Sequence, residues 1–295
     1  MVERLKTAVA KARAEREQRL ANVKAAPAAE PVSRAAEMAA QTVPAAPVVT
    51  QATSPTDAVE SAWNALEEIR LDPKHLERNR IITRERQNPA YVAFDVLRTR
   101  ILRAFSKHGW SRVGITSPTK GCGKTFTAAN LALSLARQKD CRTVLMDLDL
   151  RAPALAKTLG VEQMEPINWF LSGDVPTQET LRRVDRNLAL GLNDKKVPNA
   201  AETLLAPSAG KALDDMCATL APDIVVYDLP PMLSCDDVLG FLPQLDCILL
   251  IVGGGITRPD EITECERLLA DQTHLLGVLL NRGEDAKSSR YGYEG

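Results

Sequence analysis

The sequence has few of the residues that build metal centres, disulfides or membrane spans. Its six cysteines form no C-x-x-C pair, its three histidines are isolated, and only 4% of residues are aromatic. Several cysteines lie in apolar runs, which predicts small core residues of a reduced, cytosolic protein rather than disulfides or zinc or iron–sulfur ligands. No apolar run approaches the ~18–20 residues that cross a bilayer. The N-terminus also lacks the apolar core of a signal peptide.

Charge is almost balanced, with a formal net charge of −1. We therefore expect no global attraction to nucleic acid. A hydrophobic content of 45% over 295 residues supports a sizeable core in one or two domains. Together these features predict a cytoplasmic protein that meets a membrane only peripherally, through surface contacts or a partner.

The chain divides into segments of different composition. Residues 1–24 carry seven basic and three acidic side chains and predict a basic helix, either a docking element or a solvated one. Residues 25–58 are rich in Ala and Pro and predict a disordered linker. Residues 59–110 predict a helical lead-in, with one helix around Ala58–Arg70 and a second around Tyr91–Phe105.

Residues 111–285 alternate between short apolar runs and helical patterns. Continuous apolar runs of this length are typical of buried parallel strands. The pattern predicts an α/β fold with a doubly wound, mostly parallel sheet, whose ligands bind at the carboxyl ends of the strands. The expected strands are Arg112–Thr116, Thr143–Met146, Leu188–Leu192, Ile224–Tyr227, Cys247–Val252 and Leu275–Leu280, and Glu261–Ala270 is an expected helix.

A phosphate-binding loop is the strongest motif. The segment RVGITSPTKGCGKTFTAANL reads as a strand, a glycine-containing turn and a helix, and the turn ends in Gly-Lys-Thr. Backbone N–H groups and a helix N-terminus of this kind hold phosphate oxygens, Lys124 can reach the β- and γ-phosphates, and the Thr125 hydroxyl suits Mg²⁺. Pro118 stands where the usual pattern has its first glycine. An ordinary glycine-rich turn is the alternative, and the strand and helix around it favour a nucleoside triphosphate site.

Carboxylates follow two of the expected strands. Asp147 and Asp149 end one apolar run, and Asp228 ends another. The carboxyl ends of parallel strands open onto the crevice that holds a phosphate-binding loop. A single aspartate there is often a helix cap, but the three together supply the oxygen ligands that Mg²⁺ prefers.

These motifs resemble those of a known family. SPTKGCGKT, VLMDLDLRAP, VVYDLPP and LLGVLLNR are similar to the Walker A, Walker A′, Walker B and C-terminal strand motifs of bacterial tyrosine kinases of capsule and exopolysaccharide synthesis. That family lies within the MinD/ParA/Mrp class of deviant P-loop ATPases. The resemblance covers about residues 88–285, and the tail SSRYGYEG is similar to a reduced tyrosine cluster.

The resemblance implies ATP and Mg²⁺ as cofactors and assigns roles by position. Lys124, Asp147, Asp149 and Asp228 are the implied catalytic residues, with Thr125, Asp147 and Asp228 at the metal. Tyr291 and Tyr293, in the tail 286–295, are the implied phosphate acceptors, although an ordinary flexible terminus is the alternative. The implied nucleotide-binding residues are Thr119, Lys120, Gly121, Cys122, Gly123, Lys124, Thr125, Phe126, Asn281 and Arg282.

Two departures from the pattern bear on function. The signature lysine of MinD/ParA ATPases falls on Thr119, with Lys120 one place late, which favours the kinase branch. The family's E-x-x-R-x-x-R oligomerisation helix falls on Val92, Asp95 and Arg98, of which only the last fits. The implied partners are other copies of the chain and a transmembrane polysaccharide co-polymerase or activator at the inner face of the plasma membrane.

Three functions remain open from the sequence. The first is an ATP-dependent protein-tyrosine autokinase that regulates exopolysaccharide or capsule synthesis. The second is a MinD/ParA-like ATPase switch that dimerises on ATP and positions cargo. The third is a nucleotide-bound regulator that has lost catalysis.

Overall fold

A computed structural model describes residues 55–82, 89–162 and 165–283 of the chain. The expected basic helix (1–24), most of the expected linker and the tyrosine-containing tail, with Tyr291 and Tyr293, lie outside the described residues. Within the described ranges, no helix combines the length and apolar character needed to span a bilayer.

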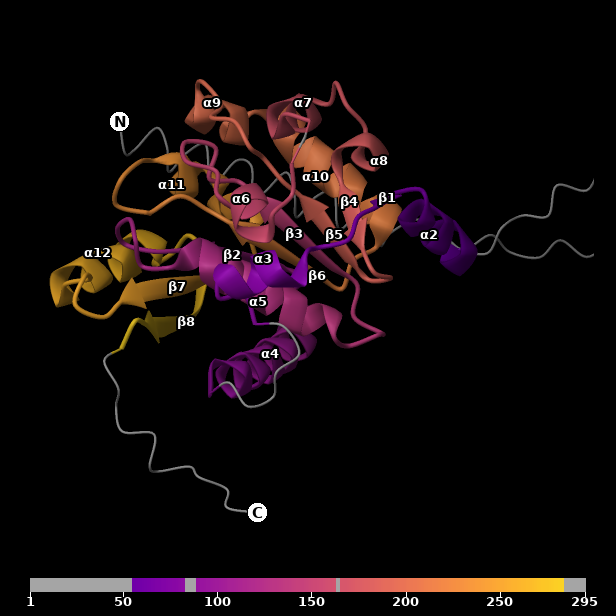
Figure 1. Cartoon of the computed structure of the whole chain (residues 1–295). Coiled ribbons are helices and arrows are strands. Elements are labelled where there is room, and N and C mark those ends of the chain that lie inside the picture. Colours follow the sequence, from indigo (N-terminus) through magenta and orange to yellow (C-terminus); the bar gives the residue numbers. More distant parts are fainter. Residues whose placement is uncertain (1–54, 83–88, 163–164, 284–295) are drawn as a thin grey trace, which may run out of the picture.

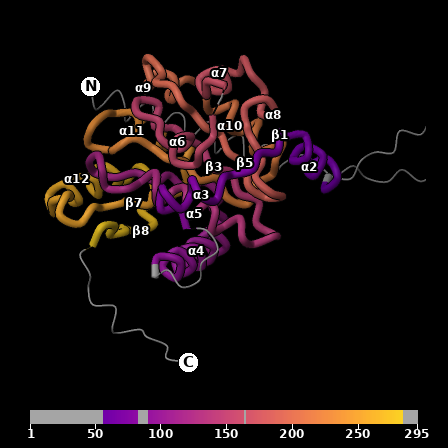
Figure 2. The backbone as a smooth tube through the Cα atoms, in the orientation of Figure 1, coloured from indigo at the N-terminus to yellow at the C-terminus, as the bar shows by residue number. Residues whose placement is uncertain are grey.

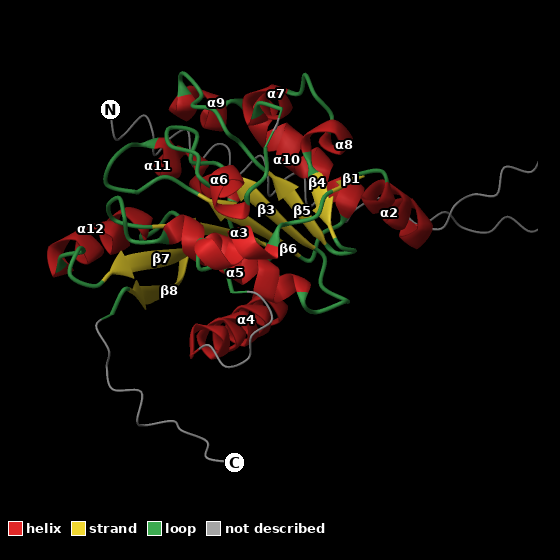
Figure 3. Cartoon of the chain, in the orientation of Figure 1, coloured by secondary structure: helices red, strands yellow, loops and turns green. Residues whose placement is uncertain are grey.

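A twisted eight-stranded sheet forms the centre of the described chain (Figure 3). Its spatial order is β1-β4-β5-β3-β6-β2-β7-β8. All neighbouring strands run parallel except β4 and β5, which are antiparallel. The strands are β1 (Glu67–Glu68), β2 (Arg112–Thr116), β3 (Thr143–Asp147), β4 (Arg182–Val184), β5 (Leu188–Gly191), β6 (Ile224–Asp228), β7 (Cys247–Gly253) and β8 (His274–Asn281).

Helices cover both faces of this sheet (Figure 1). One core contains apolar residues of four helices: α3 (Pro73–Arg78), α4 (Pro89–His108), α5 (Lys124–Ala136) and α6 (Leu155–Leu159). The other core contains α2 (Pro55–Asn64), α7 (Ile167–Ser172), α9 (Ala200–Leu205), α10 (Pro207–Leu220), α11 (Asp237–Phe241) and α12 (Pro259–Leu269). Two short helices, α8 (Thr177–Thr180) and the 3-10 turn Leu242–Gln244, complete the described elements.

Strand side chains alternate between the two cores. In β6, Val225 and Tyr227 belong to the core under α10, whereas Ile224 and Val226 belong to the core under α5. Every residue of β2, β3 and β6 is buried. Strands buried on both faces are the reason for the continuous apolar runs in the sequence, and the doubly wound, mostly parallel fold is confirmed.

The six expected strands are present, with ends shifted by about a residue. Strands β3 and β6 each extend one residue beyond the expected end. Asp147 and Asp228 are therefore the last residues of these strands rather than the residues after them. The expected helix at Glu261–Ala270 is α12, which begins two residues earlier, at Pro259. The lead-in helix expected at Tyr91–Phe105 is α4, and it extends to His108.

The helix expected around Ala58–Arg70 is wrong in its second half. Helix α2 begins at Pro55, inside the expected linker, and ends at Asn64. Glu67–Glu68 instead form β1, which pairs with β4 far along the chain (Figure 2). Cross-strand ion pairs stabilise this edge, because Arg182 and Arg183 lie 3.0 and 2.8 Å from the carboxylates of Glu67 and Glu68. These short charged strands lack the apolar pattern that identifies a buried strand.

The cysteines match the expectation of small core residues. Cys122, Cys141, Cys247 and Cys265 are buried, Cys217 and Cys235 are partly buried, and all six are free thiols.

Candidate nucleotide-binding and catalytic site

The phosphate-binding loop lies at the carboxyl end of β2, between the ends of β6 and β7. Gly121 and Gly123 adopt left-handed backbone conformations, with φ of 83° and 93°, and α5 begins at Lys124. A Cβ on Gly123 would lie 2.1 Å from Nδ2 of Asn281. Glycine is therefore favoured at 123 by its backbone conformation, and a Cβ there would also force the Asn281 side chain to move. A glycine turn that leads directly into a helix is the arrangement in which backbone amides hold anionic oxygens, and phosphate binding at this loop stays a prediction.

Backbone contacts hold the loop against the segment after β6. The Met232 amide donates to the Ser117 carbonyl at 2.8 Å, and the Leu233 amide donates to the Pro118 carbonyl at 3.1 Å. The Thr116 hydroxyl donates to the Pro230 carbonyl at 2.6 Å. Pro118 stands at the position of the usual first glycine. Its carbonyl still accepts a hydrogen bond, so this residue helps to hold the loop in place.

Three carboxylates converge beside this loop. Asp147 and Asp228 are directly paired residues on neighbouring parallel strands, and both are fully buried. Asp149 follows β3 and is 3% exposed. Lys124 Nζ lies 2.6 Å from Asp149 Oδ2 and 3.6 Å from Asp228 Oδ1. The crevice thus holds three carboxylates around one ammonium group.

Asp147 is held by the backbone that follows β3. Its Oδ2 accepts the amides of Ala154 and Leu155 at 3.0 and 2.9 Å, and Oδ1 accepts the amide of Asp149 at 3.2 Å. Burial raises the pKa of Asp147 to about 8, and the charge on Asp228 adds to this shift. Two buried carboxylates this close cannot both ionise easily without a cation.

Asp228 is the least satisfied group in the crevice. Neither carboxylate oxygen has a hydrogen-bond partner within the described part of the chain, although both are buried. Burial raises the pKa of Asp228 to about 6, and attraction by Lys124 limits the rise. Burial alone would lower the pKa of the Lys124 ammonium group. The negative charges of Asp228 and Asp149 have the larger effect, so that pKa is raised.

This donor set fits a magnesium ion. Hard oxygen ligands and excess negative charge are what Mg²⁺ requires, and neither oxygen of Asp228 has a hydrogen-bond partner within the described residues. The Thr125 hydroxyl lies beside Lys124, with 3.5 Å between Oγ1 and Nζ. Asp228, Asp147 and Thr125 are therefore the residues that would hold the ion.

The other predicted nucleotide-binding residues contribute in different ways. Asn281 donates from Nδ2 to the Cys122 carbonyl at 2.9 Å, so in this structure its side chain supports the loop itself. The Cys122 side chain is fully buried, and the Phe126 ring packs edge-on against Phe94, with centroids 6.0 Å apart. Both can therefore face phosphate only through their backbone amides.

The remaining predicted positions surround the loop. Lys120 and Gly121 are exposed at its tip, and Thr119 is half-buried. Arg282 has a left-handed φ of 55° and follows β8 next to Asn281. Nucleotide contact by these residues stays a prediction.

Sequence reasoning missed an ion pair beside the site. Arg151, two residues after Asp149, donates to both oxygens of Asp237 at 2.8 Å. Asp237 is fully buried, whereas half of the Arg151 side chain is exposed. This bidentate pair joins the loop after β3 to the start of α11. The arginine directly after the D-L-D-L run was the available signal, but its partner lies 86 residues away.

The positions that correspond to the oligomerisation helix make contacts within the chain. Arg98 Nη1 donates to Asp95 Oδ1 at 2.9 Å, one turn away on α4. Arg137, just after α5, donates to the same oxygen at 2.9 Å. Val92 is 57% exposed. Asp95 and Arg98 therefore join α4 to α5.

Comparison with known proteins finds tyrosine-protein kinases among the relatives of this chain. The tyrosine-protein kinase YwqD of Bacillus subtilis is 28% identical over 222 residues, covering 75% of this chain and 92% of YwqD. The putative tyrosine-protein kinase EpsB of Ralstonia nicotianae is 28% identical over 208 residues, covering 70% of this chain but only 27% of EpsB. The crystal structure of the VpsO kinase domain aligns with a TM-score of 0.58 at 27% identity, covering 66% of this chain and 97% of that one.

A wider family match agrees with the geometry of the crevice. The sequence pattern of the CobQ/CobB/MinD/ParA nucleotide binding domain matches residues 113–294, which begin in β2 and include the loop and all three carboxylates. This match extends over more than half of the chain. The protein is therefore a member of the CobQ/CobB/MinD/ParA nucleotide-binding domain family.

Proposed function

We propose that this chain is an ATP-dependent protein-tyrosine autokinase that serves exopolysaccharide or capsule synthesis. The observation that carries the proposal is the arrangement of Lys124, Asp149 and Asp228 beside the loop, with Asp228 unsatisfied and Lys124 between two carboxylates. Its relatives YwqD and EpsB are named tyrosine-protein kinases, and the kinase motifs in the sequence support the same activity.

The proposed reaction moves one phosphoryl group. A tail tyrosine oxygen, on Tyr291 or Tyr293, forms a bond to the γ-phosphorus while the bond from that phosphorus to the β–γ bridging oxygen breaks. ADP leaves with the bond's electron pair, and the phenol proton passes to a carboxylate. Loop amides and Lys124 stabilise the charge that develops on the transferring oxygens.

The ion pair in the crevice indicates how the base is released. Lys124 lies 2.6 Å from Asp149, so nucleotide phosphates would compete with Asp149 for the ammonium group. Asp149, once freed, would take or orient the tyrosine proton. Asp147 is less suited to that role, because three backbone amides already occupy its oxygens.

ATP and Mg²⁺ are the proposed cofactors. The bound ion would supply positive charge to the β- and γ-phosphate oxygens, held by Asp228, Asp147 and Thr125. Backbone amides of Gly121, Cys122 and Gly123 would bind the phosphates, with Asn281 fixing the Cys122 peptide.

The proposed setting is the cytoplasm, at the inner face of the plasma membrane. A transmembrane co-polymerase or activator and other copies of the chain are the proposed partners. The resemblance to capsule and exopolysaccharide kinases motivates this proposal.

Incubation of the purified protein with Mg-ATP, followed by tandem mass spectrometry, tests the activity. We expect phosphate on Tyr291 or Tyr293 in the wild type and none in Lys124→Met or in a Tyr291→Phe/Tyr293→Phe variant. ATP hydrolysis without any phosphotyrosine, accompanied by ATP-dependent dimerisation in gel filtration, would instead identify an ATPase switch.

A further inference from the structure

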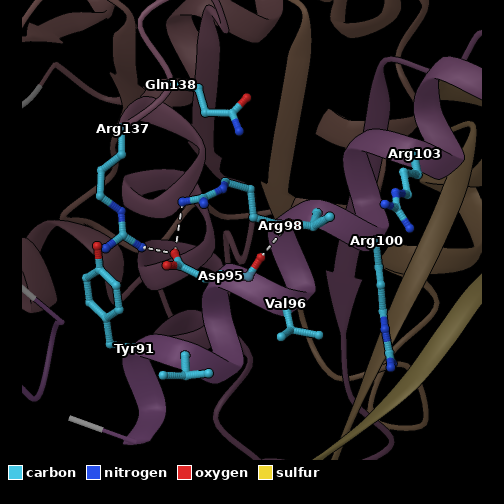
Figure 4. Close-up of a pocket in the computed structure, with 10 residues that line it drawn as sticks. Tyr91, Asp95, Val96, Arg98, Arg100, Arg103, Arg137 and Gln138 are labelled. Atoms are coloured by element: carbon cyan, nitrogen blue, oxygen red, sulfur yellow. Dashed lines mark hydrogen bonds and ion pairs between the residues drawn. The ribbon is translucent and has the colours of Figure 1, made fainter. Parts of the chain in front are cut away.

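A second cavity lies apart from the phosphate-binding loop, along α4 and the residues that follow α5. Its volume is about 750 Å³, and it contains Tyr91, Val92 and Val96 as well as several arginines (Figure 4). The elements around it share the core under α5, but none of the three crevice carboxylates lines it.

The cavity has more hydrogen-bond donors than acceptors. Four arginines line it, at positions 98, 100, 103 and 137, with Asp95 as the one carboxylate among the described lining residues. Asp95 Oδ1 already accepts from both Arg98 and Arg137. The Nε atoms of these two arginines are buried without a partner within the described ranges. Four guanidinium groups against one carboxylate that two of them already share make the lining electropositive, which suits an anionic ligand with several acceptor oxygens.

The cavity also offers an apolar surface for a ring. Val92 and Val96 lie one turn apart on α4 and are 57% and 45% exposed. The Arg137 guanidinium lies over the Tyr91 ring, 4.1 Å from its centroid. A small inorganic anion would leave this apolar surface uncovered. A phosphate attached to an aromatic ring would satisfy the arginines and cover the valines together.

We propose that this arginine pocket binds phosphotyrosine, and that its occupant is the phosphorylated C-terminal tail of this chain. The identity of the occupant rests on the proposed kinase function, which makes that tail the product. Bound there, the phosphorylated tail would be kept out of the nucleotide crevice, so the pocket would act as a product-holding site.

The tail follows β8, a strand that packs against the same core as α4. Leu276 and Leu279 of β8 pack against the core that contains Phe94 and Ile101 of α4. Twelve residues follow Gly283, and Tyr291 is the eighth of them. Eight extended residues span at most about 26–29 Å, which is close to the ~30 Å length of a 20-residue helix such as α4. This reach sets the largest distance from Gly283 at which Tyr291 of the same chain can occupy the pocket.

The test measures binding of synthetic peptides and needs no kinase activity. A fluorescent peptide of residues 284–295, phosphorylated on Tyr291 and Tyr293, is titrated with the full chain carrying Tyr291→Phe and Tyr293→Phe, without ATP. The unphosphorylated peptide and a peptide with glutamate at both tyrosine positions are compared by anisotropy. We expect the phosphorylated peptide to bind at least about tenfold more tightly than either.

Charge reversal locates the site. Arg100 and Arg103 are exposed, so Arg100→Glu/Arg103→Glu should fold normally, which its melting temperature and its Mg-ATP binding check. We expect this variant to lose at least about tenfold in affinity for the phosphorylated peptide. Arg186→Glu, an exposed arginine after β4, is the matched control and should bind like the parent.

Equal affinity for the three peptides, or unchanged binding by Arg100→Glu/Arg103→Glu, would overturn the proposal. Equal affinity for the glutamate peptide alone would replace phosphotyrosine with a general acidic segment. Since the peptide is phosphorylated chemically, tight binding combined with no phosphotyrosine in the Mg-ATP assay of the unsubstituted chain would reject the proposed kinase function and leave the pocket's specificity standing.

Discussion

The nucleotide crevice and the arginine pocket have opposite charge imbalances. In the crevice, three buried carboxylates surround Lys124. In the pocket, four arginines stand against one carboxylate among the described lining residues, that of Asp95, which pairs with Arg98 and Arg137. Each place also has buried atoms with no hydrogen-bond partner in the described part of the chain: the two oxygens of Asp228 in the crevice, and the Nε atoms of Arg98 and Arg137 beside the pocket.

This contrast shows how an unsatisfied buried group indicates the sign of a missing ligand. Folding alone gains nothing from a buried polar atom that has no hydrogen-bond partner, which costs free energy. The crevice therefore fits a cation together with phosphates, and the pocket fits an anion. The two sites also differ in construction. Strand ends fix the crevice, whereas the pocket lies on the exposed side of one helix, where its affinity can be tuned at small cost to the fold.

Replacing Lys124 should have the largest effect. Lys124→Met leaves Asp149 and Asp228 buried without their cation, so the free energy of unfolding without ligands should fall by about 3 kcal/mol. Phosphoryl transfer should fall by at least about 100-fold, because the lysine also stabilises the transferring oxygens. Denaturant unfolding and a phosphotyrosine assay measure the two effects. The double variant Lys124→Met/Asp149→Asn should regain part of the stability but none of the activity. Failure of the second change to restore stability would contradict the charge account.

Asp228→Asn should separate stability from function. Burial raises the pKa of this carboxyl above its unfolded value, so its charged form destabilises the folded protein at neutral pH. The free energy of unfolding without Mg²⁺ should therefore be maintained or rise by about 1–3 kcal/mol, while the increase in melting temperature on adding Mg-ATP disappears.

Asp214→Asn is the matched control for Asp228→Asn. Asp214 pairs with Arg112 at 2.7 Å, and Arg112 is the first residue of β2, at the opposite end of that strand from the loop. This variant should lose stability but keep the Mg-ATP response. A normal response to Mg-ATP in Asp228→Asn would remove Asp228 from the metal site.

The two loop glycines give a smaller and more specific comparison. Gly121 and Gly123 both have a left-handed φ, but they differ in the space around them. A Cβ added to Gly121 would have no neighbour within 4 Å, whereas a Cβ added to Gly123 would lie 2.1 Å from the Asn281 side chain. Gly121→Ala should lower the free energy of unfolding by only about 1 kcal/mol, the cost of holding alanine in a left-handed conformation. Gly123→Ala should cost more and weaken ATP binding, and Gly123→Ala/Asn281→Gly should recover part of the loss. Calorimetric titration with ATP checks this order, and equal losses at both glycines would contradict it.

Asp95→Asn should produce the smallest effect, confined to the arginine pocket. Arg98 and Arg137 lose their shared carboxylate, so stability should fall by about 1 kcal/mol. With less competition for the guanidinium groups, affinity for the phosphorylated tail peptide should rise severalfold, while ATP binding by the crevice stays unchanged. Weaker peptide binding in this variant would show that Asp95 shapes the pocket rather than competing with its ligand.

The crevice was more predictable from the sequence than the pocket, for a physical reason. Its residues follow buried strands, whose apolar runs identify them, and parallel strands bring their carboxyl ends to one edge. Asp147 and Asp228 were therefore placed together correctly from 81 residues apart in sequence. The partners of Asn281 and Arg151 were not predictable, because loop contacts carry no periodic pattern. The pocket depends on how α4 crosses the end of α5, which places Arg137 over Tyr91, and sequence spacing does not encode that crossing.

The most direct test of the central claim mixes two inactive copies. One carries Lys124→Met with both tail tyrosines intact, and the other has an intact crevice with Tyr291→Phe and Tyr293→Phe. After incubation with Mg-ATP, tandem mass spectrometry locates any phosphate. The account predicts phosphate on Tyr291 or Tyr293 of the Lys124→Met copy, delivered by the crevice of the other. Hydrolysis of ATP with no phosphate on either tyrosine would contradict it.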